Sequence, residues 1–262
     1  MTPLSAGNAR VKQARKLSRR SERSERRLFL VEGWKAVAEA AQVAGCVVEV
    51  FVTPTAAEAQ ADLLSHLGVP VHVVDERAAE SLAGAVTPQG IVAVCRFVDV
   101  PVADALAGDT VAICADVRDP GNAGTIIRTA DAAGASGVVL AGNSVDPYND
   151  KAVRATVGSL FHLPIALADD PAGTVAAARE AGYRVLAADG AGEVDLFSAG
   201  DRLRGKVAWL FGNEAWGLPS GLAALADHRV AIPILGRAES LNLATAAAVC
   251  LYASARSRLG VL

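Results

Sequence analysis

Residues 207–251 read VAWLFGNEAWGLPSGLAALADHRVAIPILGRAESLNLATAAAVCL, and this stretch decides the fold. An apolar run at 207–211 breaks into Gly212-Asn213-Glu214, and a second run at 229–235 breaks into the polar segment 236–242. Short apolar runs bounded by glycine and proline indicate buried strands, and the alanine-rich segment after them indicates a helix. Ligands of open α/β sheets lie beyond the carboxyl ends of strands, so the two loops are predicted site loops.

Apolar runs alternate with helical segments along the rest of the chain. The sequence predicts strands at 46–52, 69–74, 91–97, 110–115, 137–140, 164–167 and 183–188. It predicts helices at 34–44, 56–67, 75–82, 125–133 and 171–181, and a loop with a helix at 147–159. Asp75 is expected to cap the third of these helices. Short strands separated by helices predict an α/β fold with a parallel, helix-covered sheet.

The same pattern divides the chain into four parts. Residues 1–27 form a basic arm, of which 1–8 are expected to be disordered and 9–27 to be helical, with Val11, Leu17 and Leu28 as sparse apolar positions. Residues 28–98 form an α/β module small enough to be a binding domain. Residues 99–108 lack a clear period and contain Pro101, so they are the predicted linker, and 109–262 form the larger domain.

Composition excludes several classes of protein. The chain has 262 residues, of which 52% are hydrophobic, and no apolar run approaches the roughly 20 residues of a membrane span. The basic, polar N-terminus lacks the apolar core of a secretory signal. Four scattered cysteines without a C-x-x-C pair favour reduced thiols in the cytoplasm over disulfides or zinc: Cys46, Cys95, Cys114 and Cys250. The histidines lack ligand-like spacing, so no metal is expected: His66, His72, His162 and His228.

Charge is distributed unevenly along the chain. Residues 1–30 hold nine basic and two acidic side chains, a net of +7, so the remainder carries −10 within a total of −3. A basic segment on an acidic body indicates contact with a polyanion, although a solubilising helix face explains it equally well.

Residues 116–128 have the strand, glycine loop and helix order of an anion or nucleotide site. They match neither G-x-G-x-x-G nor G-x-x-x-x-G-K-[ST], which excludes the ordinary dinucleotide and P-loop readings. Asn122 is expected near the helix N-cap and Arg128 within the first two turns, where the macrodipole disfavours a cation. Arg128 therefore either has a functional role or is a surface arginine whose aliphatic stem covers the sheet edge while its charge stays in solvent. Gly190-Ala191-Gly192 carries little weight, because Glu193 rather than a helix start follows it.

Three segments resemble, in order, the three motifs of the SpoU/TrmH methyltransferases: DPGNAGTIIRTA (119–130), FGNEAWGL (211–218), and IPI (232–234) with ESLNLA (239–244). These enzymes use S-adenosylmethionine to methylate the ribose 2′-hydroxyl of RNA. The segment RLFLVEGWKAVAE (27–39) is similar to the start of the family's N-terminal substrate-binding domain. The resemblance covers nearly all of the chain after the basic arm.

The resemblance implies a fold, a cofactor and an assembly. The fold is a C-terminal SPOUT parallel sheet with a deep trefoil knot, an exception to the rule against knots, beside a smaller α/β domain resembling a ribosomal-protein RNA-binding fold. S-adenosylmethionine would sit in the knot, and a homodimer would share residues between active sites. The implied cofactor residues are Leu140, Ala141, Gly142, Phe211, Gly212, Asn213, Ile232, Ile234, Ser240 and Leu241. Gly212 is expected to allow close approach of the ligand to the backbone.

The resemblance also implies catalytic roles. Arg128 matches the arginine that acts on the 2′-hydroxyl with help from an RNA phosphate, and the polar residues that position the ribose match Asn122, Glu214, Ser240 and Asn242. A ribose hydroxyl is a poor nucleophile at neutral pH, so a positioned base is needed. Ala215 stands where the motif often has glycine, which matters if that position needs a positive φ.

The basic arm supplies the predicted RNA contacts: Arg10, Arg15, Arg19, Arg20, Arg23 and Arg27. The arm and the extra module favour ribosomal RNA over transfer RNA as the substrate. A tRNA 2′-O-methyltransferase and a non-catalytic RNA-binding or ribosome-assembly factor are the alternatives, while the missing fingerprint weakens a nucleotide-binding oxidoreductase. Trp34, Trp209 and Trp216 are expected to be packing residues, with Trp216 the most doubtful because it lies in a site loop.

Overall fold

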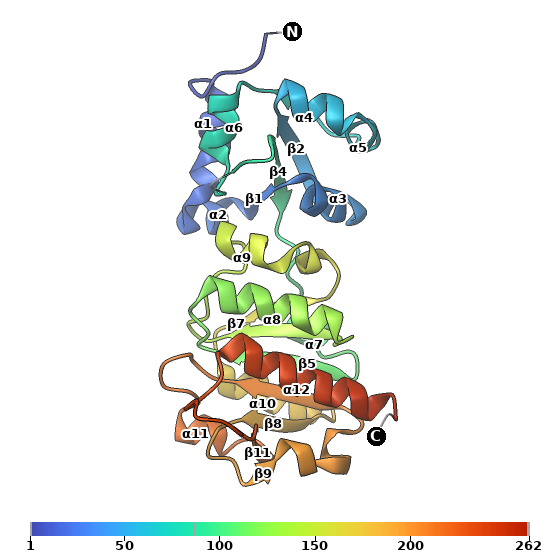
Figure 1. Ribbon diagram of the computed structural model, residues 1–262. Helices are drawn as coiled ribbons and strands as arrows, with labels where there is room; N and C mark the ends of the chain where they lie inside the picture. Colours follow the sequence, from blue (N-terminus) through green and yellow to red (C-terminus); the bar gives the residue numbers. More distant parts are fainter. Residues whose placement is uncertain (1, 86, 261–262) are drawn as a thin grey trace. The chain divides into compact units, whose positions relative to one another are not determined.

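The computed structural model describes residues 2–85 and 87–260, which form two compact units (Figure 1). The N-terminal unit comprises the chain up to Val98 together with Asp146–His162. The C-terminal unit comprises Asp99–Val145 and the chain from Leu163 onward. A segment from the middle of the sequence thus completes the N-terminal unit.

The N-terminal unit is built on a four-stranded sheet in the order β1-β4-β2-β3. Its strands are β1 (Leu28–Glu32), β2 (Val47–Val52), β3 (Val71–Val73) and β4 (Ile91–Arg96). β4 pairs antiparallel with β1 and β2, and β3 pairs parallel with β2. The helices are α1 (Ala9–Arg15), α2 (Arg20–Arg26), α3 (Trp34–Gln42), α4 (Pro54–Ala59), α5 (Ala61–His66), α6 (Glu76–Leu82) and α9 (Asp150–Thr156), with 3-10 turns at Lys16–Ser18 and Ser159–Phe161. Asp75 caps α6 as predicted, since its side chain accepts from the Ala78 N–H at 2.7 Å.

The N-terminal segment is folded, with α1 and α2 in the predicted helical range 9–27, so the prediction of disorder in 1–8 is wrong for the described residues 2–8. Leu4 forms a parallel bridge with Val74. Val11, Ala14 and Leu17 are buried in one cluster with side chains of the sheet. Their spacing of three places them on one helical face, and the basic residues between them occupy the opposite face.

The predicted RNA contacts of this segment differ in their surroundings. Arg15, Arg19, Arg20 and Arg27 are exposed, and the Arg27 guanidinium lies 4.7 Å from the Phe97 ring centroid. Arg10 pairs with Glu49 at 2.8 Å.

Arg23 is the exception, because it is 3% exposed. Its Nε and Nη2 donate to Asp146 Oδ2 at 2.9 and 2.7 Å, and its Nη1 donates to the carbonyls of Leu17 and Ser18 at 3.0 and 2.8 Å. The guanidinium thus fastens α2 to the segment that begins at Asp146, and this arrangement gives no support to the predicted RNA contact of Arg23.

The C-terminal unit contains a seven-stranded sheet in the order β7-β6-β5-β10-β8-β11-β9. Its strands are β5 (Thr110–Ala115), β6 (Gly137–Ala141), β7 (Ile165–Ala168), β8 (Arg184–Ala188), β9 (Val194–Asp195), β10 (Val207–Phe211) and β11 (His228–Ala231). Every neighbouring pair is parallel, and β5, β6 and β10 are buried throughout. The predicted parallel, helix-covered sheet is confirmed.

Helices cover both faces of this sheet (Figure 1). They are α7 (Val102–Ala105), α8 (Pro120–Ala132), α10 (Pro171–Glu180), α11 (Ser220–Ala223) and α12 (Leu243–Arg258), with 3-10 turns at Leu196–Ser198 and Gly200–Leu203. α12 packs on α8 and on β10, where the buried Trp209 donates from Nε1 to Ser254 Oγ at 2.8 Å. Trp209 is the packing residue that the sequence predicted. Within 2–85 and 87–260, no helix is long and apolar enough to cross a membrane.

Three differences from the predicted element boundaries bear on the site. The proposed linker 99–108 is part of this unit, since it contains α7 and buries Ala105 and Leu106 in the core. α8 begins at Pro120 rather than 125, because Asp119 is the N-cap and proline is favoured in the first turn. Arg128 is therefore the ninth helical residue. The macrodipole acts on charges in the first turn, so it does not disfavour a cation at this position. β11 ends at Ala231, shortly before Pro233, which has no N–H for a ladder.

Candidate active site

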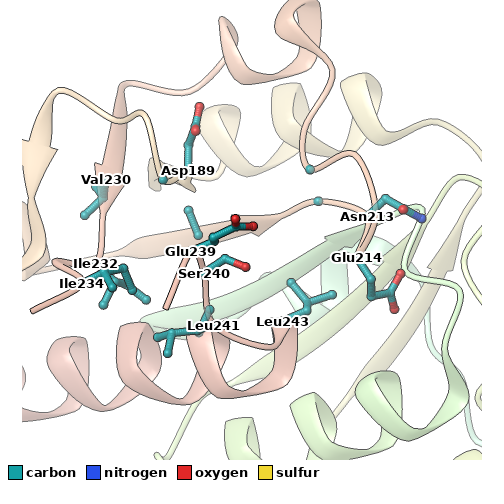
Figure 2. Close-up of a pocket in the computed structure, with 15 residues that line it drawn as sticks. Asp189, Asn213, Glu214, Val230, Ile232, Ile234, Glu239, Ser240, Leu241 and Leu243 are labelled. Carbon is teal, nitrogen blue, oxygen red and sulfur yellow. The ribbon is translucent and has the colours of Figure 1, made fainter. Parts of the chain in front are cut away.

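A cavity of about 330 Å³ lies where β8, β10 and β11 end and α12 begins. Its walls come from residues 188–190, 212–217, 230–234 and 239–246. Figure 2 shows Ile232 and Ile234 at one end of the cavity and Asn213 and Glu214 at the other. The carboxyl ends of neighbouring parallel strands meet at one edge of a sheet, which explains why loops distant in sequence share one cavity.

Six predicted cofactor residues line this cavity together: Gly212, Asn213, Ile232, Ile234, Ser240 and Leu241. Phe211 does not line it, because its side chain is fully buried in β10. The predicted catalytic residues Glu214 and Ser240 are also in the lining. Both site loops that the sequence singled out therefore face one space.

The predicted cofactor loop Leu140-Ala141-Gly142 does not line this cavity. It ends β6, which β5 separates from β10. A side chain at Gly142 would meet Asp116 Oδ1 at 2.7 Å rather than the cavity. β8 is the other neighbour of β10, and its loop Ala188-Asp189-Gly190 supplies the wall instead. Gly190 and Gly192, which follow β8, were the feature of the sequence that could have indicated this loop.

Glu214 joins the loop after β10 to the start of α8. Its Oε1 accepts from the Asp119 N–H at 3.0 Å and from Asn122 Nδ2 at 3.2 Å. Its Oε2 accepts from the Arg118 N–H at 3.2 Å. A carboxylate with three donors is well placed to hold the two loops at a fixed spacing.

Asn242 continues this network to α12. Its Nδ2 donates to Asn122 Oδ1 at 3.0 Å, and its Oδ1 caps the helix by accepting from the Ala244 and Thr245 N–H groups at 2.9 and 3.3 Å. The line Asn242, Asn122 and Glu214 thus connects all three sequence motifs. Asn122 is the middle member, because it donates to one partner and accepts from the other.

The loop after β10 is internally braced. Asn213 and Gly217 exchange two backbone hydrogen bonds of 3.0 and 2.9 Å, and Asn213 Nδ2 donates to the Asp116 carbonyl at 2.7 Å. The Ala215 N–H donates to Asn213 Oδ1 at 2.8 Å. Ala215 is not among the residues with positive φ, so its methyl group imposes no backbone strain at the point where the motif often has glycine.

Gly212 is required by the packing of its own loop. A Cβ at this position would press on the carbonyl of Gly217 and lie 2.6 Å from the Leu218 nitrogen. Backbone atoms of a braced loop have little freedom to move aside. Close approach of the chain to itself is thus a sufficient reason for this glycine, and close approach of a ligand stays a prediction.

Arg128 lies on α8 with an exposed side chain and does not line the cavity. Among the described residues it has no hydrogen bond or ion pair, so its guanidinium is available to a ligand. Trp216 is 54% exposed, and the Arg118 guanidinium lies 5.0 Å from its ring centroid. Trp216 is therefore not a packing residue, and the pair forms an exposed, cationic surface beside Glu214.

The hydrogen bonds of Glu214 shift its acidity. Burial raises the pKa of Glu214, but the N–H groups of Glu214, Asp119 and Arg118 and the Asn122 amide outweigh it, leaving the pKa below its ordinary value. The site therefore favours the ionised form of Glu214.

This shift predicts a pH-dependent contribution to stability. Ionised Glu214 stabilises the folded state above the ordinary carboxyl pKa, and the contribution is lost as pH falls through the lowered folded pKa. The Tm of the wild type should exceed that of Glu214→Gln at about pH 6, and the difference should shrink towards about pH 3. Glu239→Gln, at an exposed position of the same cavity, is the control. A Tm difference that stays constant with pH would contradict the interpretation.

Within 2–85 and 87–260, no cluster of three or more histidine, cysteine or acidic side chains is arranged to hold a metal ion. The site consists instead of main-chain groups, amides and carboxylates beside an apolar wall.

Comparisons with known proteins agree with this arrangement. The model of the SpoU rRNA Methylase family matches residues 109–252, and that of the MRM3-like substrate binding domain matches 8–93. The chain is 35% identical to 23S rRNA (guanosine(2553)-2'-O)-methyltransferase RlmP of Bacillus subtilis, over 95% of this chain and 96% of that protein.

Two solved structures are similar over nearly their whole length. An AdoMet-bound rRNA methyltransferase from Sinorhizobium meliloti is 38% identical with a TM-score of 0.85, covering 97% of this chain and 96% of that one. The SpoU methyltransferase AviRb from Streptomyces viridochromogenes, in complex with AdoMet, is 30% identical with a TM-score of 0.87, covering 97% and 100%. The resemblance predicted from the three motifs is confirmed, and the chain belongs to the SpoU rRNA Methylase family.

Proposed function

We propose that this protein transfers a methyl group from S-adenosylmethionine to a ribose 2′-hydroxyl of ribosomal RNA. The observation that carries the proposal is the hydrogen-bonded line of Asn242, Asn122 and Glu214, of which Glu214 lines the cavity. The names of the similar proteins support ribosomal RNA as the substrate.

The chemistry of the cavity fits S-adenosylmethionine. Ile232, Ile234 and Leu241 give an apolar wall for the adenine ring, while Asp189 and Glu239 place acidic groups beside a ligand that carries a sulfonium cation. The bound cofactor supplies an electrophilic methyl group. The residues of the chain therefore have to orient the ribose and help its proton to leave.

Arg128 and the Asn122 network are suited to that task. The new bond joins the 2′-oxygen to the methyl carbon, the carbon–sulfur bond breaks, and its electron pair stays on sulfur. We propose that Arg128 binds an RNA phosphate, because its exposed guanidinium has no partner among the described residues. An oxygen of this phosphate would receive the proton of the 2′-hydroxyl. Asn122, Asn242 and Ser240 would position the ribose.

We also propose a homodimer, a trefoil knot and a cytoplasmic location. A homodimer is supported by the exposed apolar side chains of Tyr252 and Leu259 on the last helix. A trefoil knot is supported by the return of the chain from β11, near one edge of the sheet, to α12 beside β10. A cytoplasmic location is supported by four free, buried cysteines.

Gly212→Ala should damage the cofactor site. Because the new Cβ would press on the Gly217 backbone, the loop has to shift, at a cost of about 1–3 kcal/mol in the free energy of unfolding. S-adenosylmethionine binding, measured by calorimetry, should weaken by at least about tenfold. Gly221→Ala is the matched control, since nothing lies within 4 Å of a Cβ there. Equal cofactor affinity in both variants would show that the loop tolerates the change.

The function is tested by transfer of labelled methyl groups to unmodified ribosomal RNA and, separately, to unmodified transfer RNA. Label in ribosomal RNA at a ribose 2′-oxygen is the expected result. Label in transfer RNA alone would mean that the substrate is transfer RNA and that the type of reaction is as proposed. Cofactor binding without transfer to either RNA would favour a non-catalytic RNA-binding or assembly factor.

A further inference from the structure

Trp216 and Arg118 form a pair of exposed side chains beside the candidate active site. Trp216 lies in the loop after β10, and it is 54% exposed. Arg118 lies in the loop between β5 and α8, and its guanidinium is 5.0 Å from the Trp216 ring centroid. Both residues belong to the C-terminal unit, and neither is among the residues that line the cofactor cavity. The pair therefore presents a surface just outside that cavity.

The backbone on both sides of this pair is fixed. The loop that carries the indole ring is closed by the two backbone hydrogen bonds between Asn213 and Gly217. The Arg118 N–H donates to Glu214 Oε2 at 3.2 Å, so the carboxylate that joins the two site loops also holds the arginine backbone. Both side chains are thus presented by loops that are already ordered, which lowers the entropy lost when a ligand binds.

The fold itself makes little use of the two side chains. Among the described residues, the Arg118 guanidinium makes no hydrogen bond or ion pair. The pair of Lys206 and Tyr183 is different, because Tyr183 is 3% exposed and its hydroxyl donates to the Gly108 carbonyl at 2.6 Å. That aromatic ring belongs to the core, whereas the Trp216 ring and its guanidinium are open to solvent.

The chemistry of the pair fits an unpaired nucleotide. An exposed indole stacks on the face of any base, and a planar guanidinium both stacks on aromatic rings and binds phosphate. The position fits as well. Trp216 is two residues from Glu214, a distance of at most about 7 Å along the chain. Glu214 is hydrogen-bonded to Asn122, one of the residues proposed to position the ribose.

We propose that Trp216 stacks on the base of an unpaired nucleotide next to the methylated one, and that Arg118 binds the phosphate of that nucleotide. The inference rests on the proposed function, because it takes RNA as the substrate. It makes both side chains substrate-binding residues and restricts methylation to single-stranded RNA. Stacking is tolerant of sequence, so the contact selects an unpaired base rather than a particular base.

A second copy of this chain fits the pair less well. An apolar protein surface placed on Trp216 would bury the Arg118 guanidinium without an acceptor, which is costly for a charged group. RNA brings a phosphate with every base, so it satisfies the ring and the cation together.

The test follows Trp216 fluorescence in a Trp34→Phe background, where the other tryptophan, Trp209, is fully buried. A short single-stranded RNA should quench this fluorescence, because a stacked base contacts the indole. The same strand annealed to its complement should not quench it. A strand of the same length without bases should also fail, since it offers phosphates but nothing to stack.

Substitutions measure the strength of the contact through the anisotropy of a labelled single strand. Trp216→Ala should raise the Kd about tenfold, whereas Trp216→Phe should retain most of the affinity. Arg118→Gln should reduce the slope of log K against log salt by about 1. Phe197→Ala removes another exposed aromatic ring of the same unit, 64% exposed, and should leave the Kd unchanged. S-adenosylmethionine should bind all four variants with the wild-type Kd.

Three results would overturn the proposal. They are absence of quenching, equal quenching by the strand without bases, and a change of oligomeric state in Trp216→Ala by sedimentation, which would assign the pair to a second copy. The binding readouts require no methyl transfer. If single-stranded RNA quenches Trp216 but no RNA is methylated, the stacking contact stands and the proposed function falls. If wild type and Trp216→Ala methylate ribosomal RNA with the same KM, the stacking contact falls alone.

Discussion

Arg128→Ala is expected to lower the rate of methyl transfer by about 10²–10⁴-fold while leaving the Kd for S-adenosylmethionine nearly unchanged. The exposed Arg128 side chain lies outside the cavity lining and has no partner among the described residues, so the fold loses no contact that would change cofactor binding. The loss should appear in single-turnover transfer to ribosomal RNA, where product release does not limit the rate.

Two further variants define the role of this arginine. Arg128→Lys keeps the charge but cannot hold a phosphate through two parallel N–H groups, so it should recover a small part of the rate. Arg202→Ala removes an exposed arginine from the same unit and should transfer methyl groups at the wild-type rate. Loss of cofactor binding in Arg128→Ala would mean that the residue is structural, and an unchanged rate would remove it from the mechanism.

Local patterns predicted much of the larger unit. The run Val207–Phe211 is β10 with the predicted bounds, and the alanine-rich segment after it is α12. α8 was predicted to start too late because the glycines at 121 and 124 suggested a loop. The stronger signal was Asp119 followed by Pro120, an N-cap residue and a first-turn proline.

The site was predicted less completely, because strand order depends on long-range packing. Residues 140–142 and 188–190 both follow short apolar strands, and nothing local says which strand pairs with β10. The sheet order puts β8 there and β6 one strand away. The structure brings Asn122, Glu214 and Asn242 together, and Asn242 also caps α12. One amide thus serves both the fold and the site, a coupling that spacing alone does not reveal.

The N-terminal segment was misread for a different reason. Nine basic side chains in 1–30 suggested an arm separate from the module, and the sparse apolar positions of the predicted helix were not recognised as a face that packs in the core. Net charge indicates how a segment interacts with polyanions and gives no information on whether it folds. Deleting 1–27 would therefore expose the core of the unit, so point substitutions are needed to test RNA contact.

Arg23→Ala is expected to destabilise the N-terminal unit by about 3–5 kcal/mol, because it leaves the carboxylate of Asp146 buried without its partner. The two side chains are 4% and 10% exposed, so solvent screens the pair little. Trp34 is the one tryptophan of the sequence in this unit, and urea unfolding followed by its fluorescence measures the change there. The substitutions Trp209→Phe and Trp216→Phe remove the fluorescence of the two tryptophans in the other unit.

Arg20→Ala separates this structural role from RNA contact. Arg20 is exposed and three residues from Arg23, so its removal should change the free energy of unfolding by less than about 0.5 kcal/mol. If Arg20 contacts a phosphate, the same variant should reduce the slope of log K against log salt by about 1. Arg23→Ala should leave that slope unchanged under conditions where the protein is folded, because its guanidinium is already committed to Asp146 and two carbonyls. The opposite result, a reduced slope with wild-type stability, would mean that Arg23 leaves Asp146 to bind RNA.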